Sequence, residues 1–141
     1  MTPLLEGKPV SILVIEADKI VREVVSRIIV NEGFHVLSAS SAAEALNIED
    51  GFGGTIQLLI SDVMMTDMSG PEVATKMKIL RPNMKVMLIS GYPDGALLLL
   101  NYGWHFIQKP FLPADLAARI KEVLSSEISD QGFYRFDTRE N

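Results

Sequence analysis

Apolar residues along this chain fall into two alternating patterns. Short runs rich in Val, Ile and Leu are typical of buried strands, and the first covers residues 10–15. The segment after it carries apolar residues at helical spacing, which predicts a helix with one broad apolar stripe of Ile20, Val21, Val24, Val25, Ile28 and Ile29. Gly33 follows this segment and is the residue type that commonly ends a helix.

The same alternation continues to about residue 126. Further strands are predicted at residues 34–39, 56–61, 85–90 and 105–108. Helices are predicted at about residues 41–48, 69–81, 93–103 and 113–126. Ser41 with Glu44, and Ser69 with Glu72, have the spacing of a capping box at a helix start. Residues 49–54 are mostly Gly and Asp, which predicts a flexible loop.

Strands that alternate with helices over short connections predict an α/β fold. We expect a doubly wound, five-stranded parallel sheet with helices on both faces. The runs at residues 12–15, 58–60 and 86–89 are continuously apolar, as strands covered on both faces should be. In such sheets ligands bind outside the carboxyl ends of the strands, so the residues that follow each strand are the candidate site.

Composition narrows the function classes. The 141 residues suit one domain, and the net charge of −5, with Lys and Arg scattered singly, offers no basic face for nucleic acid. There are no cysteines, which excludes disulfides and thiolate chemistry. No apolar run reaches the length of a membrane span, and the first ten residues lack the pattern of a secretory signal. We therefore expect no nucleic acid or membrane partner and a cytoplasmic location.

Polar residues follow four of the five predicted strands. An acid after a strand is often only a solvated or capping residue, but here two carboxylate positions, a hydroxyl and an ammonium come from one sheet edge. Phosphoryl transfer uses such a set: an acceptor oxygen, a cation that neutralises phosphoryl oxygens and a hydroxyl that orients one of them. The residues are Glu16, Ala17 and Asp18, then Asp62, Ser90 and Lys109.

The chain resembles the receiver domains of two-component response regulators from about residue 10 to residue 126. The resemblance rests on "ILVIEADKIVR", "LLISDVMMTDMSGPE", "VMLISGY" and "FIQKPF", in that order. It implies a flavodoxin-like (βα)5 fold in which Asp62 accepts a phosphoryl group from a histidine kinase or phosphotransfer protein. It also implies that Lys109 pairs with the acceptor carboxylate, and that Ser90 hydrogen-bonds the phosphoryl group.

Further roles carry over by the same resemblance. The backbone carbonyl of Met64 matches a Mg²⁺ ligand, Phe106 matches an aromatic switch, and the bond between Lys109 and Pro110 is expected to be cis. The fourth helix, at residues 93–103, contains four successive leucines, which cannot all face the core. A downstream partner or a homodimer is therefore expected on the face made by this helix, the fifth strand and the last helix.

Ala17 departs from the family pattern. The family has two acids after the first strand, and the second usually contacts the metal, but alanine has no ligand atom. We expect Mg²⁺ binding to be weakened and to use Glu16, Asp62 and the Met64 carbonyl, with water or Asp18 in the vacant position.

Domain organisation follows from the extent of the resemblance. We expect residues 1–9 to be an N-terminal extension, residues 10–127 the receiver domain and residues 128–141 a tail without an output domain. A stand-alone regulator and a receiver from a hybrid histidine kinase both fit this layout.

Two other classes of function were weighed against the phosphoacceptor. A degenerate receiver that binds partners without phosphorylation is favoured by Ala17 and opposed by the intact Asp62, Ser90 and Lys109. An aspartyl phosphatase usually has a second acid where Met64 stands, and the first loop is too acidic for a flavin site. We therefore expect a signalling domain rather than an enzyme, with at most self-phosphorylation from small donors and autodephosphorylation.

Overall fold

The computed structural model describes residues 4–5, 8–91 and 104–126 of the chain. Its main sheet has five parallel strands in the order β4-β3-β5-β6-β7. These strands are β3 (Ser11–Ile15), β4 (His35–Ala39), β5 (Leu58–Asp62), β6 (Lys85–Ser90) and β7 (His105–Gln108). A short antiparallel pair, β1 (Leu4–Leu5) and β2 (Lys8–Pro9), precedes them. The predicted doubly wound parallel sheet is confirmed.

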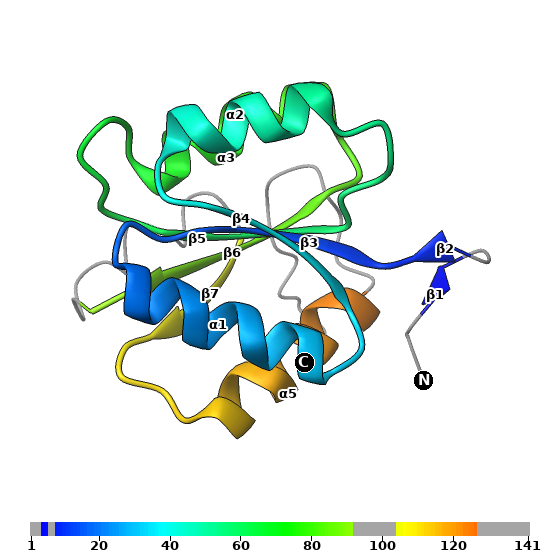
Figure 1. Cartoon of the computed structure of the whole chain (residues 1–141), viewed down its shortest axis with the longest axis vertical. Coiled ribbons are helices and arrows are strands. Elements are labelled where there is room, and N and C mark those ends of the chain that lie inside the picture. Colours follow the sequence, from blue (N-terminus) through cyan, green and yellow to red (C-terminus); the bar gives the residue numbers. More distant parts are fainter. Residues whose placement is uncertain (1–3, 6–7, 92–103, 127–141) are drawn as a thin grey trace, which may run out of the picture.

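Four helices cover the two faces of the sheet. Figure 1 shows α2 and α3 on one face and α1 and α5 on the other. Their bounds are α1 (Lys19–Asn31), α2 (Ala42–Gly51), α3 (Gly70–Leu80) and α5 (Pro113–Ser125). None of these four helices is long and apolar enough to cross a membrane. The helix predicted at residues 93–103 lies outside the described residues.

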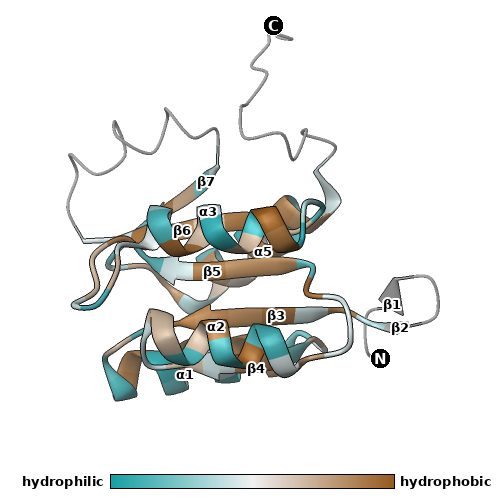
Figure 2. Cartoon of the chain, turned by 90° about the horizontal axis from the view of Figure 1, so that it is seen from above, coloured by the Kyte–Doolittle hydropathy of each residue, from teal (hydrophilic) through white to brown (hydrophobic). Residues whose placement is uncertain are grey.

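The central strands are buried on both faces. Alternate residues of β3 enter different cores: Ile12 and Val14 pack on the side of α1 and α5, whereas Leu13 and Ile15 pack on the side of α2 and α3. Figure 2 shows β3, β5 and β6 as largely hydrophobic bands between the helices. Burial on both faces explains why these strands read as continuous apolar runs in the sequence.

The predicted stripe on α1 is only partly buried. Val25, Ile28 and Ile29 are buried, but 73% of Ile20 and 48% of Val24 are exposed. Ile20 and Val24 are one turn apart on the flank of the stripe, so they point away from the direction that the buried residues share. They form an exposed apolar surface at the start of α1.

Helix ends follow the predicted signals, with two differences. The predicted capping box at Ser41 is half formed, because the Ser41 hydroxyl accepts the Glu44 N–H but the Glu44 carboxylate accepts the N–H of Ser40. Gly33 has φ 94° after α1, and Ser69 and Glu72 form a complete capping box. Helix α2 continues through residue 51, so the predicted loop at residues 49–54 begins only at residue 52. Arg81 accounts for the extension, because its guanidinium donates to the carbonyl oxygens of Glu49 and Phe52 at 3.2 and 2.9 Å.

Candidate functional site

The carboxyl ends of four strands bring the candidate residues to one edge of the sheet. Asp62 ends β5, Ser90 ends β6, and Glu16 and Lys109 directly follow β3 and β7. Backbone pairing continues past these ends, since the Lys109 N–H donates to the Ser90 carbonyl at 2.8 Å. Backbone pairing between the strands therefore sets the relative positions of these four residues, independently of contacts between their side chains.

Lys109 joins two carboxylates. Its Nζ atom lies 3.1 Å from Oε1 of Glu16 and 3.2 Å from Oδ1 of Asp62. Glu16 is buried, with 4% of its surface exposed. One ammonium thus balances two buried or half-buried carboxylates, which leaves an excess negative charge in the cluster.

The surroundings shift the pKa values of this cluster. Burial, the charge of Glu16 and a hydrogen bond with its carboxyl group raise the pKa of Asp62 to about 6, against the lowering effect of Lys109. Burial lowers the pKa of Lys109, but the hydrogen bonds and charges of Glu16 and Asp62 outweigh it and raise that pKa above its ordinary value. Lys109 therefore stays a cation at neutral pH, while Asp62 titrates close to the physiological range.

The loop after β3 is held by its own hydrogen bonds. Oε2 of Glu16 accepts the Asp18 N–H at 3.0 Å, and Oδ1 of Asp18 accepts the Val21 N–H at 3.0 Å as the N-cap of α1. The Arg22 guanidinium donates to the Glu16 carbonyl oxygen at 2.7 Å. The Asp18 side chain is exposed and serves the helix, while Ala17 adds no polar atom.

The oxygen donors at this edge are few. Among the described residues no group of three His, Cys, Asp or Glu side chains could hold a metal ion. Glu16 and Asp62 supply two carboxylates at this edge, and Met64 lies in the loop that follows β5. Mg²⁺ is commonly held by one or two carboxylates together with water and phosphate oxygens. The donor set therefore fits Mg²⁺, with one carboxylate fewer than the receiver pattern provides.

Ser90 lies on β6, next to the strand that carries Asp62, and Phe106 lies on β7, one strand farther out. Ser90 is buried at the end of β6, and Phe106 is half-buried in β7 and packs against the core beneath α2 and α3. The Lys109–Pro110 peptide bond is cis, as the resemblance implies. Glu16, Asp62, Ser90 and Lys109 thus belong to one edge of the sheet, whereas Phe106 lies within β7 and the Asp18 side chain caps α1.

Sequence reasoning missed Gly70 and Arg22. A Cβ atom at Gly70 would lie 2.2 Å from the Asp62 carbonyl oxygen, so only glycine allows α3 to begin against the acceptor residue. Its N–H also donates to the Val63 carbonyl at 2.8 Å. The available signal for the Gly70 contact was a glycine directly after the capping Ser69. The signal for Arg22 was its place in the first turn of α1, close in sequence to Glu16.

Comparisons with known proteins agree with this geometry. The family described as response regulator receiver domain matches residues 12–121. The sensor kinase CckA of Brucella abortus is 32% identical over 120 residues, covering 83% of this chain and 13% of the kinase. The transcriptional regulatory protein YvrH of Bacillus subtilis is 30% identical over 142 residues, covering 90% of this chain and 56% of the regulator. The chain thus spans less than two thirds of these relatives.

Solved structures show the same fold over most of the chain. A CheY-like receiver domain protein from Methanospirillum hungatei has a TM-score of 0.74 and 32% identity, covering 83% of this chain and 94% of that one. The receiver domain of the hybrid histidine kinase CckA has a TM-score of 0.70 and 38% identity, covering 81% and 98%. Together with the family match, these likenesses show that the chain belongs to the response regulator receiver domains of two-component systems.

Proposed function

We propose that Asp62 accepts a phosphoryl group from a phosphohistidine of a histidine kinase or phosphotransfer protein. A carboxylate oxygen of Asp62 attacks phosphorus, the P–N bond to the donor imidazole breaks, and the imidazole leaves with the bonding electron pair and takes up a proton. The observation that carries the proposal is the contact of Lys109 with both Asp62 and Glu16 at 3.2 and 3.1 Å. This contact supplies a fixed cation beside the acceptor oxygen.

Lys109 and Ser90 have complementary roles in this reaction. The ammonium of Lys109, which contacts only carboxylates before transfer, moves toward the oxygens of the new phosphoryl group and neutralises their negative charge. The Ser90 hydroxyl, at the end of the neighbouring strand, hydrogen-bonds one of these oxygens. Phe106 then changes its packing in β7, which alters the face formed by β7 and α5 for a downstream partner or a second copy.

Mg²⁺ is the cofactor that this site would use. When bound, it supplies positive charge that offsets the charge of the transferred phosphoryl group. Asp62, Glu16 and the Met64 carbonyl would hold it. Because Oε1 of Glu16 already pairs with Lys109 and Ala17 offers no oxygen, we expect weaker binding than in a site with a further acid. Asp18 is a weaker candidate because its carboxylate caps α1.

Exposed apolar residues around the site support a protein rather than a small molecule as the phosphoryl donor. Ile20 and Val24 lie on α1, Met64 follows β5, and Leu112 precedes α5, each at least 48% exposed. These elements border the carboxyl edge of the sheet where Asp62 lies. Apolar side chains around a polar centre are typical of a surface that a partner covers.

Acetyl phosphate provides the test. Wild type and Asp62→Asn are incubated with acetyl phosphate over a Mg²⁺ series, and the intact mass is measured. We expect a phosphoryl adduct on wild type alone, at Mg²⁺ concentrations that Ala17→Asp lowers. Absence of an adduct at every Mg²⁺ concentration would instead support the alternative function, a degenerate receiver that binds proteins without phosphorylation. Ala17 is the observation that favours this alternative.

A further inference from the structure

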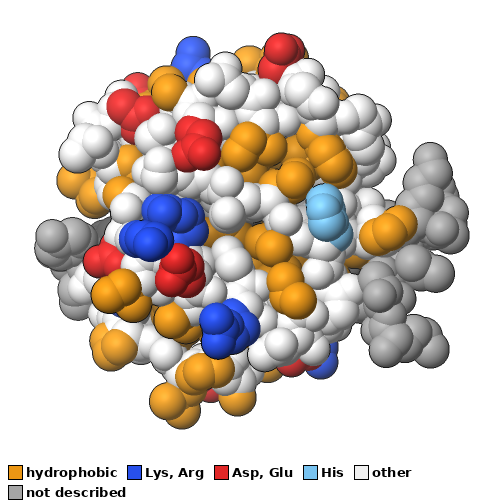
Figure 3. Space-filling view, viewed as in Figure 1, with side chains coloured by type: hydrophobic (Ala, Val, Ile, Leu, Met, Phe, Trp, Pro, Cys, Tyr) orange, Lys and Arg blue, Asp and Glu red, His pale blue; other side chains and the backbone are white. Residues whose placement is uncertain are grey.

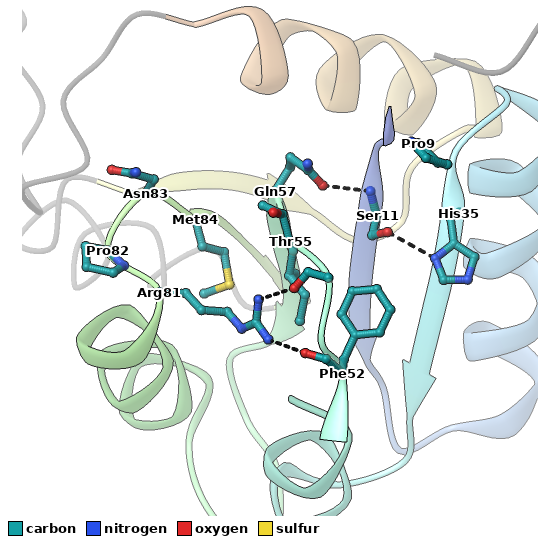
Figure 4. Close-up of a pocket in the computed structure, with 12 residues that line it drawn as sticks. Pro9, Ser11, His35, Phe52, Thr55, Gln57, Arg81, Pro82, Asn83 and Met84 are labelled. Carbon is teal, nitrogen blue, oxygen red and sulfur yellow. Dashed lines mark hydrogen bonds between the residues drawn. The ribbon is translucent and has the colours of Figure 1, made fainter. Parts of the chain in front are cut away.

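A cavity of about 740 Å³ lies at the amino edge of the sheet, opposite the site at Asp62. It is formed by the first residues of β3 and β4, the loop between α2 and β5, and the loop between α3 and β6, as Figure 4 shows. Its size is within the range of cavities that bind drug-sized ligands or groups of side chains. The proposed phosphoryl transfer does not use this cavity.

The walls of the cavity are preformed and mostly apolar. The ring of Phe52 stacks on that of His35, with centroids 6.0 Å apart. His35 is also held by Ser11, whose hydroxyl lies 3.0 Å from Nδ1, and the Ser11 N–H donates to Gln57 at 2.7 Å. Met84 contributes a buried apolar surface. An aromatic group fits such walls because it offers ring faces for stacking and a flat apolar surface.

The positive charge of Arg81 in the cavity wall is neutralised by Glu49. The Arg81 guanidinium is fixed by Glu49, at 3.0 Å, and by the Gly54 carbonyl, at 2.8 Å. Because Glu49 neutralises Arg81, the cavity has no strong preference for an anion, and an uncharged aromatic occupant suits it better than a phosphate or a carboxylate.

The last described residues of the chain lie at the same edge of the sheet as this cavity. Helix α5 ends at the amino edge of the sheet, where Lys85 donates to the carbonyl oxygens of Val123, at 3.3 Å, and Ser126. Lys85 follows Met84 in the sequence, and its N–H donates to the Gln57 carbonyl at 2.9 Å. Both Met84 and Gln57 line the cavity. Ser126, the last described residue, therefore contacts a strand start whose neighbours line the cavity.

The sequence beyond residue 126 contains a suitable occupant. It reads "EISDQGFYRFDTREN", with three aromatic residues among residues 133–136. Position 133 is seven residue steps after position 126, and seven steps span up to roughly 23 Å when extended, enough to reach a cavity at the edge where Lys85 lies. We propose that the aromatic residues Phe133, Tyr134 and Phe136 dock in the amino-edge cavity and hold the segment after α5 against the domain.

Disulfide trapping tests the proposed contact, because the chain has no native cysteine. The full chain carries Asn83→Cys on the exposed cavity rim together with Asp137→Cys, with oxidised glutathione as the oxidant. The control pairs Asp137→Cys with Met64→Cys, which is 67% exposed at the opposite edge. We expect the intramolecular disulfide to form about tenfold faster in the first pair, because docking raises the local thiol concentration. Equal rates, or intermolecular disulfides alone, would overturn the proposal.

Hydrogen exchange on cysteine-free protein gives a second test. The triple variant Phe133→Ser, Tyr134→Ser, Phe136→Ser leaves the described core intact, so its folding is not at risk. We expect amides at residues 52–57 to exchange faster in this variant than in wild type, with no change in the matched polar control Gln131→Ser, Thr138→Ser. Identical exchange in the triple variant and wild type would show that the segment does not occupy the cavity and would refute the docking.

Discussion

Gly70 provides a sharp test of how α3 supports the acceptor residue. The change Gly70→Ala adds a methyl group 2.2 Å from the Asp62 carbonyl oxygen and 3.1 Å from its carbonyl carbon. Ordinary contact begins near 3.4 Å, so α3 and the end of β5 must separate by about 1 Å. Overpacking of this kind costs about 1–3 kcal/mol, and we expect the upper end because backbone atoms cannot rotate away.

Thermal unfolding and acetyl phosphate reactivity measure the two consequences of Gly70→Ala. A loss of about 3 kcal/mol corresponds to a fall in Tm on the order of 10 °C. Displacement of Asp62 by about 1 Å should slow phosphorylation on the order of 100-fold. The control is Gly51→Ala at the end of α2, where an added Cβ has no atom within 4 Å, and it should be neutral or stabilising by up to about 1 kcal/mol. If Gly70→Ala kept the Tm and the phosphorylation rate of wild type, the proposed contact between α3 and the Asp62 backbone would be refuted.

Four further predictions test the site and its supports. The pKa of Asp62 is raised to about 6 in the folded state, so ionising its carboxyl group destabilises the fold as the pH rises from about 4 to about 6. Asp62→Asn should therefore be more stable than wild type above about pH 6 in urea unfolding, and the difference should shrink toward about pH 4. The rate of phosphorylation of wild type by acetyl phosphate should fall as the pH drops through about 6, because only the ionised carboxylate attacks. Lys109→Gln should raise the pKa of Asp62 further in an NMR titration, since Lys109 lowers it now. Arg81→Ala should cost about 2–4 kcal/mol in urea unfolding, because it removes the Glu49 pair and the donors to the end of α2; a loss below about 1 kcal/mol would contradict that role.

Local and periodic features were predictable from the sequence. The apolar runs gave the five strands, and capping residues such as Ser69 marked helix starts, because these signals act within a few residues of chain. The continuation of α2 to Gly51 was not predictable, since its carbonyls are bonded by Arg81, about thirty positions away in the sequence. Propensity alone favours a loop there, and a tertiary contact overrides it.

The site shows the same division between sequence and structure. Parallel strand ends predicted that Asp62 and Lys109 would share one edge of the sheet. The distances and the choice of partner depend on the fold. Lys109 pairs with Glu16 as well as with Asp62, so one oxygen of Glu16, an expected Mg²⁺ ligand, is already engaged by an ammonium. The exposure of Ile20 was likewise set by where the sheet and α5 lie around α1, which periodicity does not specify.

Reductive trapping of the acyl phosphate tests the central proposal most directly. The full chain is treated with acetyl phosphate and Mg²⁺, reduced with borohydride, and digested for peptide mass spectrometry. Borohydride converts an aspartyl phosphate to homoserine and leaves unmodified carboxylates unchanged. The proposed function predicts homoserine at position 62 in wild type and in the Gly51→Ala control, and none in Asp62→Asn. Homoserine at another acid such as Asp67, or at no position, would contradict the assignment of Asp62 as the phosphoacceptor.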